Sequence, residues 1–204
     1  GTLIREYIAG KRKKYMSPVT LLLICAGLSY LSINAFDLGE VNMRNMPAPE
    51  TLEFSSEASK ERYIQRYDRA YQFNMFINKN SKLVTLSATP LLALLYWLLF
   101  LKARFNYFEH LVACMFSNSA TSLVYALILM PIVSLMGGGM IYLVVTFLFL
   151  VGETIYRAWC YYGMMGYHGW KKAIKVFFYS LVVTGVWSLF SAGMGFLFIS
   201  GFFS

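Results

Sequence analysis

The chain has 204 residues, of which 58% are hydrophobic and 18% aromatic, whereas only 14% are charged. An average soluble domain is about 45–50% apolar and about 25% charged, so a soluble globule of this size would lack the polar surface that it needs. Disorder is excluded on the same grounds, because disordered segments contain few hydrophobic residues. The composition predicts an integral membrane protein. The net charge of +8 is typical of a protein that lies against anionic lipid headgroups.

Residues 1–16 form a basic segment ahead of the first apolar run. Its apolar side chains recur at helical spacing, at Ile4, Tyr7, Ile8 and Tyr15. Its basic side chains are Arg5, Lys11, Arg12, Lys13 and Lys14. This pattern is typical of a helix that lies in the membrane interface and binds anionic lipid. A plain basic flank of the first membrane span is the alternative.

The rest of the chain, residues 17–204, is expected to form one helical membrane domain. A spanning helix needs about 20 predominantly apolar residues. Five stretches fit, at about residues 17–36, 83–101, 110–136, 140–160 and 176–200. These runs are continuously apolar, whereas the strands of a barrel would alternate, so we expect an all-α fold with about five transmembrane helices.

Glycine and proline residues predict a turn between two of these spans and kinks inside two of them. Gly137–Gly139 divides one long uncharged run and predicts a turn between the third and fourth spans. If that run is not a hairpin, the number of spans is four. Pro90 and Pro131 fall inside the second and third spans, where we expect kinks whose freed carbonyls are satisfied by neighbouring helices.

The distribution of basic residues predicts the orientation. With the N-terminus in the cytoplasm, eleven basic residues fall in the inner segments and seven in the outer ones, all seven within the loop 37–82. The densest basic cluster flanks the first span, which usually dominates the orientation. We therefore expect a cytoplasmic N-terminus and an external C-terminus.

The outer loop 37–82 contains a second amphipathic helix. Helical spacing of apolar and tyrosine residues resumes over 55–78 and includes Tyr63, Tyr67 and Tyr71. A tyrosine stripe at a membrane interface suits either an aromatic belt or a docking face. The three tyrosines are candidate residues for docking a partner, and the belt is the alternative.

Ionisable residues inside membrane spans are costly and are functional candidates by default. Glu153 and Arg157 are spaced i, i+4 near the expected inner end of the fourth span, so they can pair. A polar stripe on the third span consists of His110, Cys114, Asn118 and Thr121. The candidate membrane-embedded cluster is Glu109, His110, Asn118, Glu153 and Arg157. It predicts a proton or ion pathway or a substrate pocket, or alternatively hydrogen bonds that hold the helices together.

No catalytic or cofactor motif is present in the sequence. Cys25, Cys114 and Cys160 lack C-x-x-C spacing and resemble small hydrophobic residues. The sequence has no H-E-x-x-H, phosphate-binding glycine loop or G-x-S-x-G. It also lacks the soluble basic face that nucleic-acid binding needs. We expect no catalytic residue, no metal, no cofactor and no nucleic-acid partner.

The N-terminal stretch carries a resemblance to a known family. The pattern I-R-E-Y-x-x-G-K-R-x-x-Y-x-x-P is formed by Ile4, Arg5, Glu6, Tyr7, Gly10, Lys11, Arg12, Tyr15 and Pro18. It resembles the domain of unknown function 3667, a bacterial family common in the Bacteroidota. Tyr107, Glu109 and His110 form a weaker match, and the further histidine often seen in that family is replaced here by Phe116 and Asn118.

The resemblance implies a multi-pass protein of the bacterial inner membrane and implies no activity. The resemblance also implies a short zinc ribbon ahead of this stretch, as in other members of the family. The 204 residues contain no such ribbon, which is what we expect of a chain that starts late.

Three functions are therefore considered. The first is a non-enzymatic inner-membrane subunit or scaffold that docks a larger assembly, with the lipid bilayer and other membrane proteins as partners. The second is a small transporter or channel that uses the polar cluster near the cytoplasmic face. A membrane enzyme that acts through Glu109, His110 and Glu153 ranks last.

Overall fold

The computed structural model describes residues 1–36, 46–136 and 140–201, and every regular element in these ranges is helical. The prediction of an all-helical fold is confirmed. The glycine turn predicted at Gly137–Gly139 lies outside the described residues. The helices are α1 (Thr2–Ile8), α2 (Pro18–Ala35), α4 (Glu57–Lys79), α5 (Ser81–Leu99), α6 (Tyr107–Val124), α7 (Met130–Met136), α8 (Met140–Met165) and α9 (Trp170–Ser200).

Four helical segments are long and apolar enough to cross a membrane. They are Arg12–Ala35, Tyr107–Leu135, Leu143–Met165 and Trp170–Ser200. Helices α4 and α5 meet at a sharp bend and pass the same test only together, as a broken fifth span. The described residues thus supply four to five candidate spans, in agreement with the number expected from the sequence.

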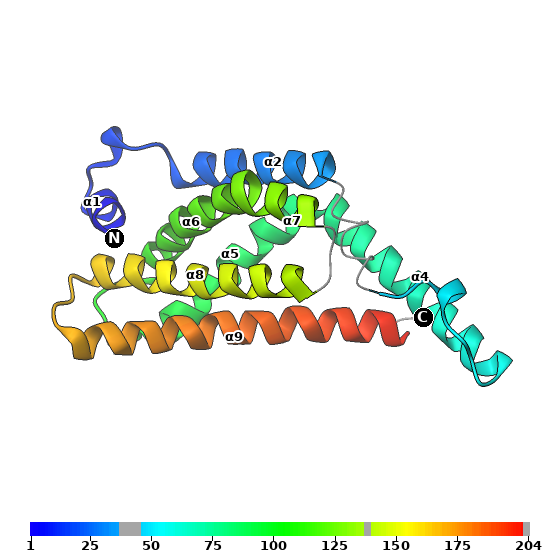
Figure 1. Ribbon diagram of the computed structural model, residues 1–204. Coiled ribbons are helices and arrows are strands. Elements are labelled where there is room, and N and C mark those ends of the chain that lie inside the picture. Colours follow the sequence, from blue (N-terminus) through cyan, green and yellow to red (C-terminus); the bar gives the residue numbers. More distant parts are fainter. Residues whose placement is uncertain (37–45, 137–139, 202–204) are drawn as a thin grey trace.

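The long helices lie side by side in a bundle (Figure 1). Helix α5 packs against α2, α6 and α9, while α8 packs against α9 and α6. The N-terminus, the α5–α6 connection and the α8–α9 connection share one end, here called the α1 end. Helix α4 packs on α9 and projects beyond the opposite end, here called the α4 end.

Helix α1 is docked on the bundle rather than lying apart from it. It packs against α8 and α6, and Ile4 is buried in the main core. A Cβ atom on Gly163 would lie 2.7 Å from the Cα atom of Gly1, so this crossing needs glycine. The helical face expected to include Tyr15 ends earlier, because Gly10 has a φ of 98° and stops the helix after Ile8.

The irregularity at Pro131 is resolved by a neighbouring helix. A π-helical turn, Tyr125–Leu129, joins α6 to α7, and the Met130 N–H donates to the carbonyl of Tyr125. With the same five-residue spacing, the carbonyl of Ala126 would accept from the N–H of residue 131, but this residue is Pro131, which has no N–H. Instead, the Ser32 hydroxyl of α2 donates to the Ala126 carbonyl at 2.7 Å. The α2–α6 contact therefore supplies the hydrogen bond that the proline cannot.

Candidate functional site

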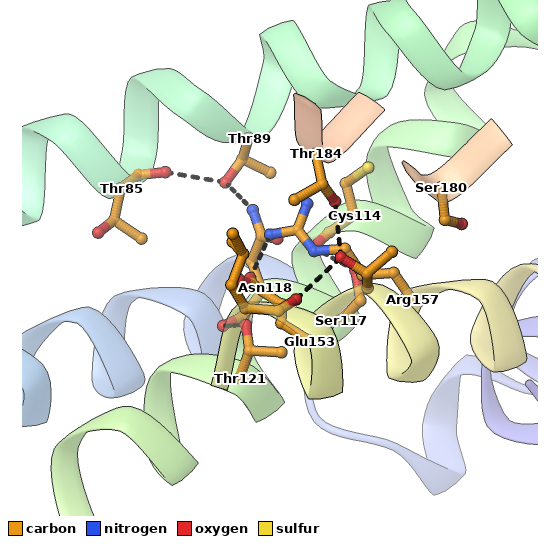
Figure 2. Close-up of polar contacts among 12 residues, drawn as sticks. Thr85, Thr89, Cys114, Ser117, Asn118, Thr121, Glu153, Arg157, Ser180 and Thr184 are labelled. Atoms are coloured by element: carbon orange, nitrogen blue, oxygen red, sulfur yellow. Dashed lines mark hydrogen bonds and ion pairs between the residues drawn. The ribbon is translucent and has the colours of Figure 1, made fainter. Parts of the chain in front are cut away.

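A cavity of about 370 Å³ lies between the helices and extends from the α4–α5 junction to the middle of α8. Its polar lining consists of Ser29, Asn78, Ser81, Thr85, Asn118, Thr121, Ser122, Glu153 and Arg157. Figure 2 shows Asn118, Glu153 and Arg157 converging from α6 and α8, with Thr85 and Thr89 on α5 alongside. These groups come from different helices, so packing of the whole bundle creates the site.

The charged pair of α8 lies at the centre of this site. Arg157 Nη2 is 2.5 Å from Glu153 Oε1, and Arg157 as a whole is only 7% exposed. The i, i+4 spacing on one helix places both side chains on the same face. The sequence placed this pair near the inner end of a span that stops at residue 160. Helix α8 instead continues to Met165, so the pair lies near the middle of the helix.

Asn118 is the second buried polar residue of the site. Its Nδ2 donates to Thr89 Oγ1 at 2.9 Å, and Thr89 donates in turn to the carbonyl of Thr85 at 2.9 Å. Asn118 is 5% exposed, yet its Oδ1 has no protein partner. Arg157 Nε and Ser81 Oγ also lack a protein partner. Because buried polar groups are nearly always hydrogen-bonded, these three atoms mark a place for a polar ligand or water.

An aromatic layer lies beside the cavity, toward the α1 end. One helical turn beyond the cavity lining on α5, α6 and α8 lie Tyr96, Cys114 and Tyr161, all fully buried. The two tyrosine rings stack with their centroids 3.8 Å apart. The Tyr96 hydroxyl donates to Ser180 at 3.0 Å, and Cys114 Sγ is 3.3 Å from the Tyr161 hydroxyl. The cavity thus lies between this aromatic layer and the α4–α5 junction.

Two of the residues expected in the cluster lie elsewhere. Glu109 accepts from the Asn106 N–H at 2.7 Å, while the Asn106 side chain accepts from the Glu109 N–H at 3.0 Å. This capping box makes Glu109 part of the start of α6. His110 is fully buried, and its ring faces those of Phe100 and Tyr161. The structure therefore brings together Asn118, Glu153 and Arg157, and it separates Glu109 and His110 from them.

The polar row on α5 was missed by the sequence analysis. Ser81, Thr85 and Thr89 are spaced i, i+4 and i+8, so they share a face that lines the cavity or contacts its lining. That spacing was visible in the sequence. Threonine and serine also satisfy their own helix carbonyls in membrane spans, so the row by itself did not single out this face.

The basic N-terminal segment is organised around Glu6. The Tyr15 hydroxyl donates to Glu6 Oε2 at 2.6 Å, and the ammonium groups of Lys11 and Lys14 lie 3.5 and 3.6 Å from the carboxylate. The hydrogen bond from Tyr15 and the positive charge of Lys11 lower the pKa of the Glu6 carboxyl below its usual value. Two of the basic residues expected to meet lipid, Lys11 and Lys14, therefore also hold this segment together.

The three candidate docking tyrosines of α4 differ in their environments. The Tyr63 hydroxyl donates to the Pro47 carbonyl at 2.7 Å, and its ring packs on Phe54. Tyr67 is half-buried, whereas Tyr71 is 47% exposed. Tyr63 thus holds a neighbouring segment, and Tyr71 is the most exposed of the three.

Among residues 1–36, 46–136 and 140–201, no group of three or more His, Cys, Asp or Glu side chains could hold a metal ion. The cysteines in this part of the chain are all free and buried.

Comparison with known proteins connects only the N-terminal part to a family. The model of the family described as "Protein of unknown function (DUF3667)" matches residues 1–30, which contain α1 and part of α2. No curated protein and no solved structure matches the chain. The residues that carry the resemblance have structural roles here: Ile4 in the core, Glu6 and Tyr15 in their hydrogen bond, Gly10 at the helix end and Pro18 at the first turn of α2. The match covers none of Asn118, Glu153 and Arg157.

Proposed function

We propose that the chain is a multi-pass membrane protein that admits a small polar ligand into the cavity between its helices, as a small transporter or channel does. The observation that carries this proposal is the cavity itself, lined at the middle of α8 by a buried charge pair and by polar atoms without protein partners. Ligand sites in helical bundles are built in this way, from side chains on facing helices.

The alternative explanation, hydrogen bonds that hold the helices together, does not account for the charge pair. Glu153 and Arg157 lie on the same helix, so their contact ties no two helices together. Burying two charges is costly even when they pair, and a hydrophobic pair would pack at least as well. Charges kept inside a membrane bundle and facing a cavity are typical of ligand or ion pathways.

Water access to the cavity tests this proposal. Thr85 lines the cavity, whereas Ser87, two residues away at nearly the same depth, faces the outer surface of the bundle. In nanodiscs, we expect a hydrophilic methanethiosulfonate to label Thr85→Cys and to leave Ser87→Cys and the parent unlabelled. The parent is a clean control because Cys25, Cys114 and Cys160 are buried. Failure to label Thr85→Cys, or equal labelling of both variants, would contradict the proposal.

For the location, we propose a bacterial inner membrane with the α1 end in the cytoplasm. The α1 end carries ten basic residues and two acidic ones. Segment 37–82, whose described part begins at residue 46 and lies at the other end, carries seven of each. Basic residues concentrate on the cytoplasmic side of membrane proteins. The resemblance of the N-terminal pattern Ile4–Pro18 to a bacterial membrane family implies the same location.

A second candidate function, a subunit or scaffold that docks another membrane protein, is favoured by the exposed apolar side chains of α4. Tyr71, Met75 and Phe76 are 47%, 47% and 60% exposed on this projecting helix. Exposed apolar patches of this kind mark interaction sites. Replacing the three by Ser should abolish recovery of a stoichiometric membrane partner, with unchanged membrane abundance. Replacing Tyr63, Tyr67 and Tyr71 by Ser should weaken recovery of this partner less, because the Tyr63 hydroxyl already donates to the Pro47 carbonyl of the same chain.

A further inference from the structure

A second, apolar cavity adjoins the polar one on the outer surface of the bundle. It has a volume of about 240 Å³ and lies between α6 and α8. It is lined by Ala120, Thr121, Val124, Phe149, Gly152, Glu153 and Tyr156. Val124 and Gly152 are exposed, so this groove faces the surroundings of the bundle, which in a membrane are lipid chains.

The two cavities meet at shared residues. Thr121, Phe149 and Glu153 line both of them. On one side of Glu153 lies the chamber that also contains Asn118 and Arg157, and on the other side lies the apolar groove. A molecule with a polar head and an apolar chain can therefore occupy both without leaving the α6–α8 side of the bundle.

The chemistry of the head follows from the groups that face it. Glu153 and Arg157 already neutralise each other, so an anionic head would meet the carboxylate and a cationic head would meet the guanidinium. Of the cavity-lining atoms without protein partners, Arg157 Nε is a donor and Asn118 Oδ1 is an acceptor, while Ser81 Oγ is a hydroxyl that can be either. A hydroxyl group both accepts and donates, so one or two hydroxyls satisfy the donor and the acceptor without adding charge.

We propose that the site binds an uncharged, hydroxyl-bearing lipid. Its hydroxyl head lies in the polar cavity beside Asn118 and Arg157, and its alkyl chain lies in the α6–α8 groove. This inference rests on the proposed function, because it names the ligand class of the same cavity. It requires that the ligand enter from the bilayer, between α6 and α8.

Gly152 gives a direct way to block the groove. A Cβ atom at Gly152 would meet nothing within 4 Å, so Gly152→Leu fills open space and replaces a poor helix former by a good one. Gly185 on α9 is the matched control, because it is also exposed, also has open space at its Cβ and lines neither cavity. Both variants are expected to fold like the parent.

The assay uses the full chain in nanodiscs and a 1-oleoylglycerol with a diazirine in its chain, with crosslinking measured by intact mass. A buried methylene contributes about fourfold in affinity, so displacing two of them lowers crosslinking about 15-fold in Gly152→Leu. Gly185→Leu should crosslink like the parent. Unlabelled 1-oleoylglycerol should compete, while methyl oleate, dioleoylphosphatidylglycerol and free glycerol should not.

Several results would overturn the inference. Equal crosslinking in Gly152→Leu and the parent would show that the groove does not hold the chain. Equal competition by methyl oleate would show that no hydroxyl head is recognised, and competition by free glycerol alone would point to a soluble polyol. In each case labelling of Thr85→Cys still reports on the polar cavity, so loss of the lipid inference is distinguishable from loss of the proposed function.

Discussion

The buried pair of α8 allows a quantitative prediction. Arg157 is 7% exposed, and removing one partner of a buried ion pair typically costs about 3–5 kcal/mol, because the other charge stays unpaired. The Glu153 side chain is 17% exposed and lines a cavity, which permits some hydration, so we expect the lower end, about 3 kcal/mol. The double variant Glu153→Gln/Arg157→Gln carries no charge, and its two amides can hydrogen-bond at the same spacing. It should cost only about 1 kcal/mol.

The two single variants should also differ from each other. The Arg157 side chain is 9% exposed and that of Glu153 is 17% exposed, so an unpaired guanidinium would be the more deeply buried charge. Glu153→Gln, which leaves Arg157 alone, should therefore be the less stable of the two.

The measurement is the fraction of monodisperse protein after heating in mild detergent, for the parent and the three variants. Glu57→Gln is the matched control, because it removes a carboxylate from an exposed pair with Lys60 and should change stability by less than about 0.5 kcal/mol. If the loss in the double variant equals the sum of the single losses, or if all three variants match the parent, the pair is not the buried unit described here. A double variant that folds normally but loses activity in the cell would assign the pair to function.

Three further predictions concern the ends of the bundle. A topology reporter fused after Ser204 should be active outside the cytoplasm and one inserted near Gly166 inside it, and the reverse pattern at both sites would overturn the proposed orientation. Gly163→Ala places a Cβ against the N-terminal backbone, so it should detach α1 and expose residues 1–16 to protease, whereas Gly152→Ala on the same helix should not. The pKa of the Glu6 carboxyl is lowered by the tyrosine hydroxyl that donates to it and by a nearby lysine. The resulting stabilisation is present above the ordinary carboxyl pKa and is lost as the pH falls through the lowered value. The protection of residues 1–16 against hydrogen exchange, relative to the intrinsic rate at each pH, should therefore fall in acid in the parent, and Glu6→Gln should lose this dependence.

Much of the fold was predictable because the apolar runs have the length of membrane-spanning helices. The details that differed depend on local backbone geometry. The first helix ends at Ile8 because Gly10 adopts a positive φ, which a helical spacing of apolar residues does not reveal. Helix α8 runs past the expected end to the turn at Gly166, and this extension moves Glu153 to the middle of the helix.

The candidate site was predictable only in part. Helical spacing shows which residues share a face of a helix, but it does not show which of them lie at the same level along the bundle axis as residues of other helices. His110 and Asn118 share a face of α6, but eight residues of helix separate them by about 12 Å along the axis. Asn118 therefore lines the cavity, while His110 lies in the aromatic layer. The role of Glu109 had a local signal, Asn106 three residues before it, which is the pattern of a capping box.

Basic residues are concentrated at the α1 end of the bundle, and this concentration bears on the orientation of the chain but not on the site. The α1 end accounts for the whole net charge of +8, segment 37–82 is neutral, and the pair on α8 is neutral by itself. Each basic residue near an anionic leaflet contributes about 1 kcal/mol, so the α1 end alone supplies a large preference for one orientation. Glu153 and Arg157 add nothing to that preference, since their charges cancel at one depth. Neither orientation nor contact between helices explains why this pair lies in the interior, and the cavity that it lines is the remaining structural feature that does.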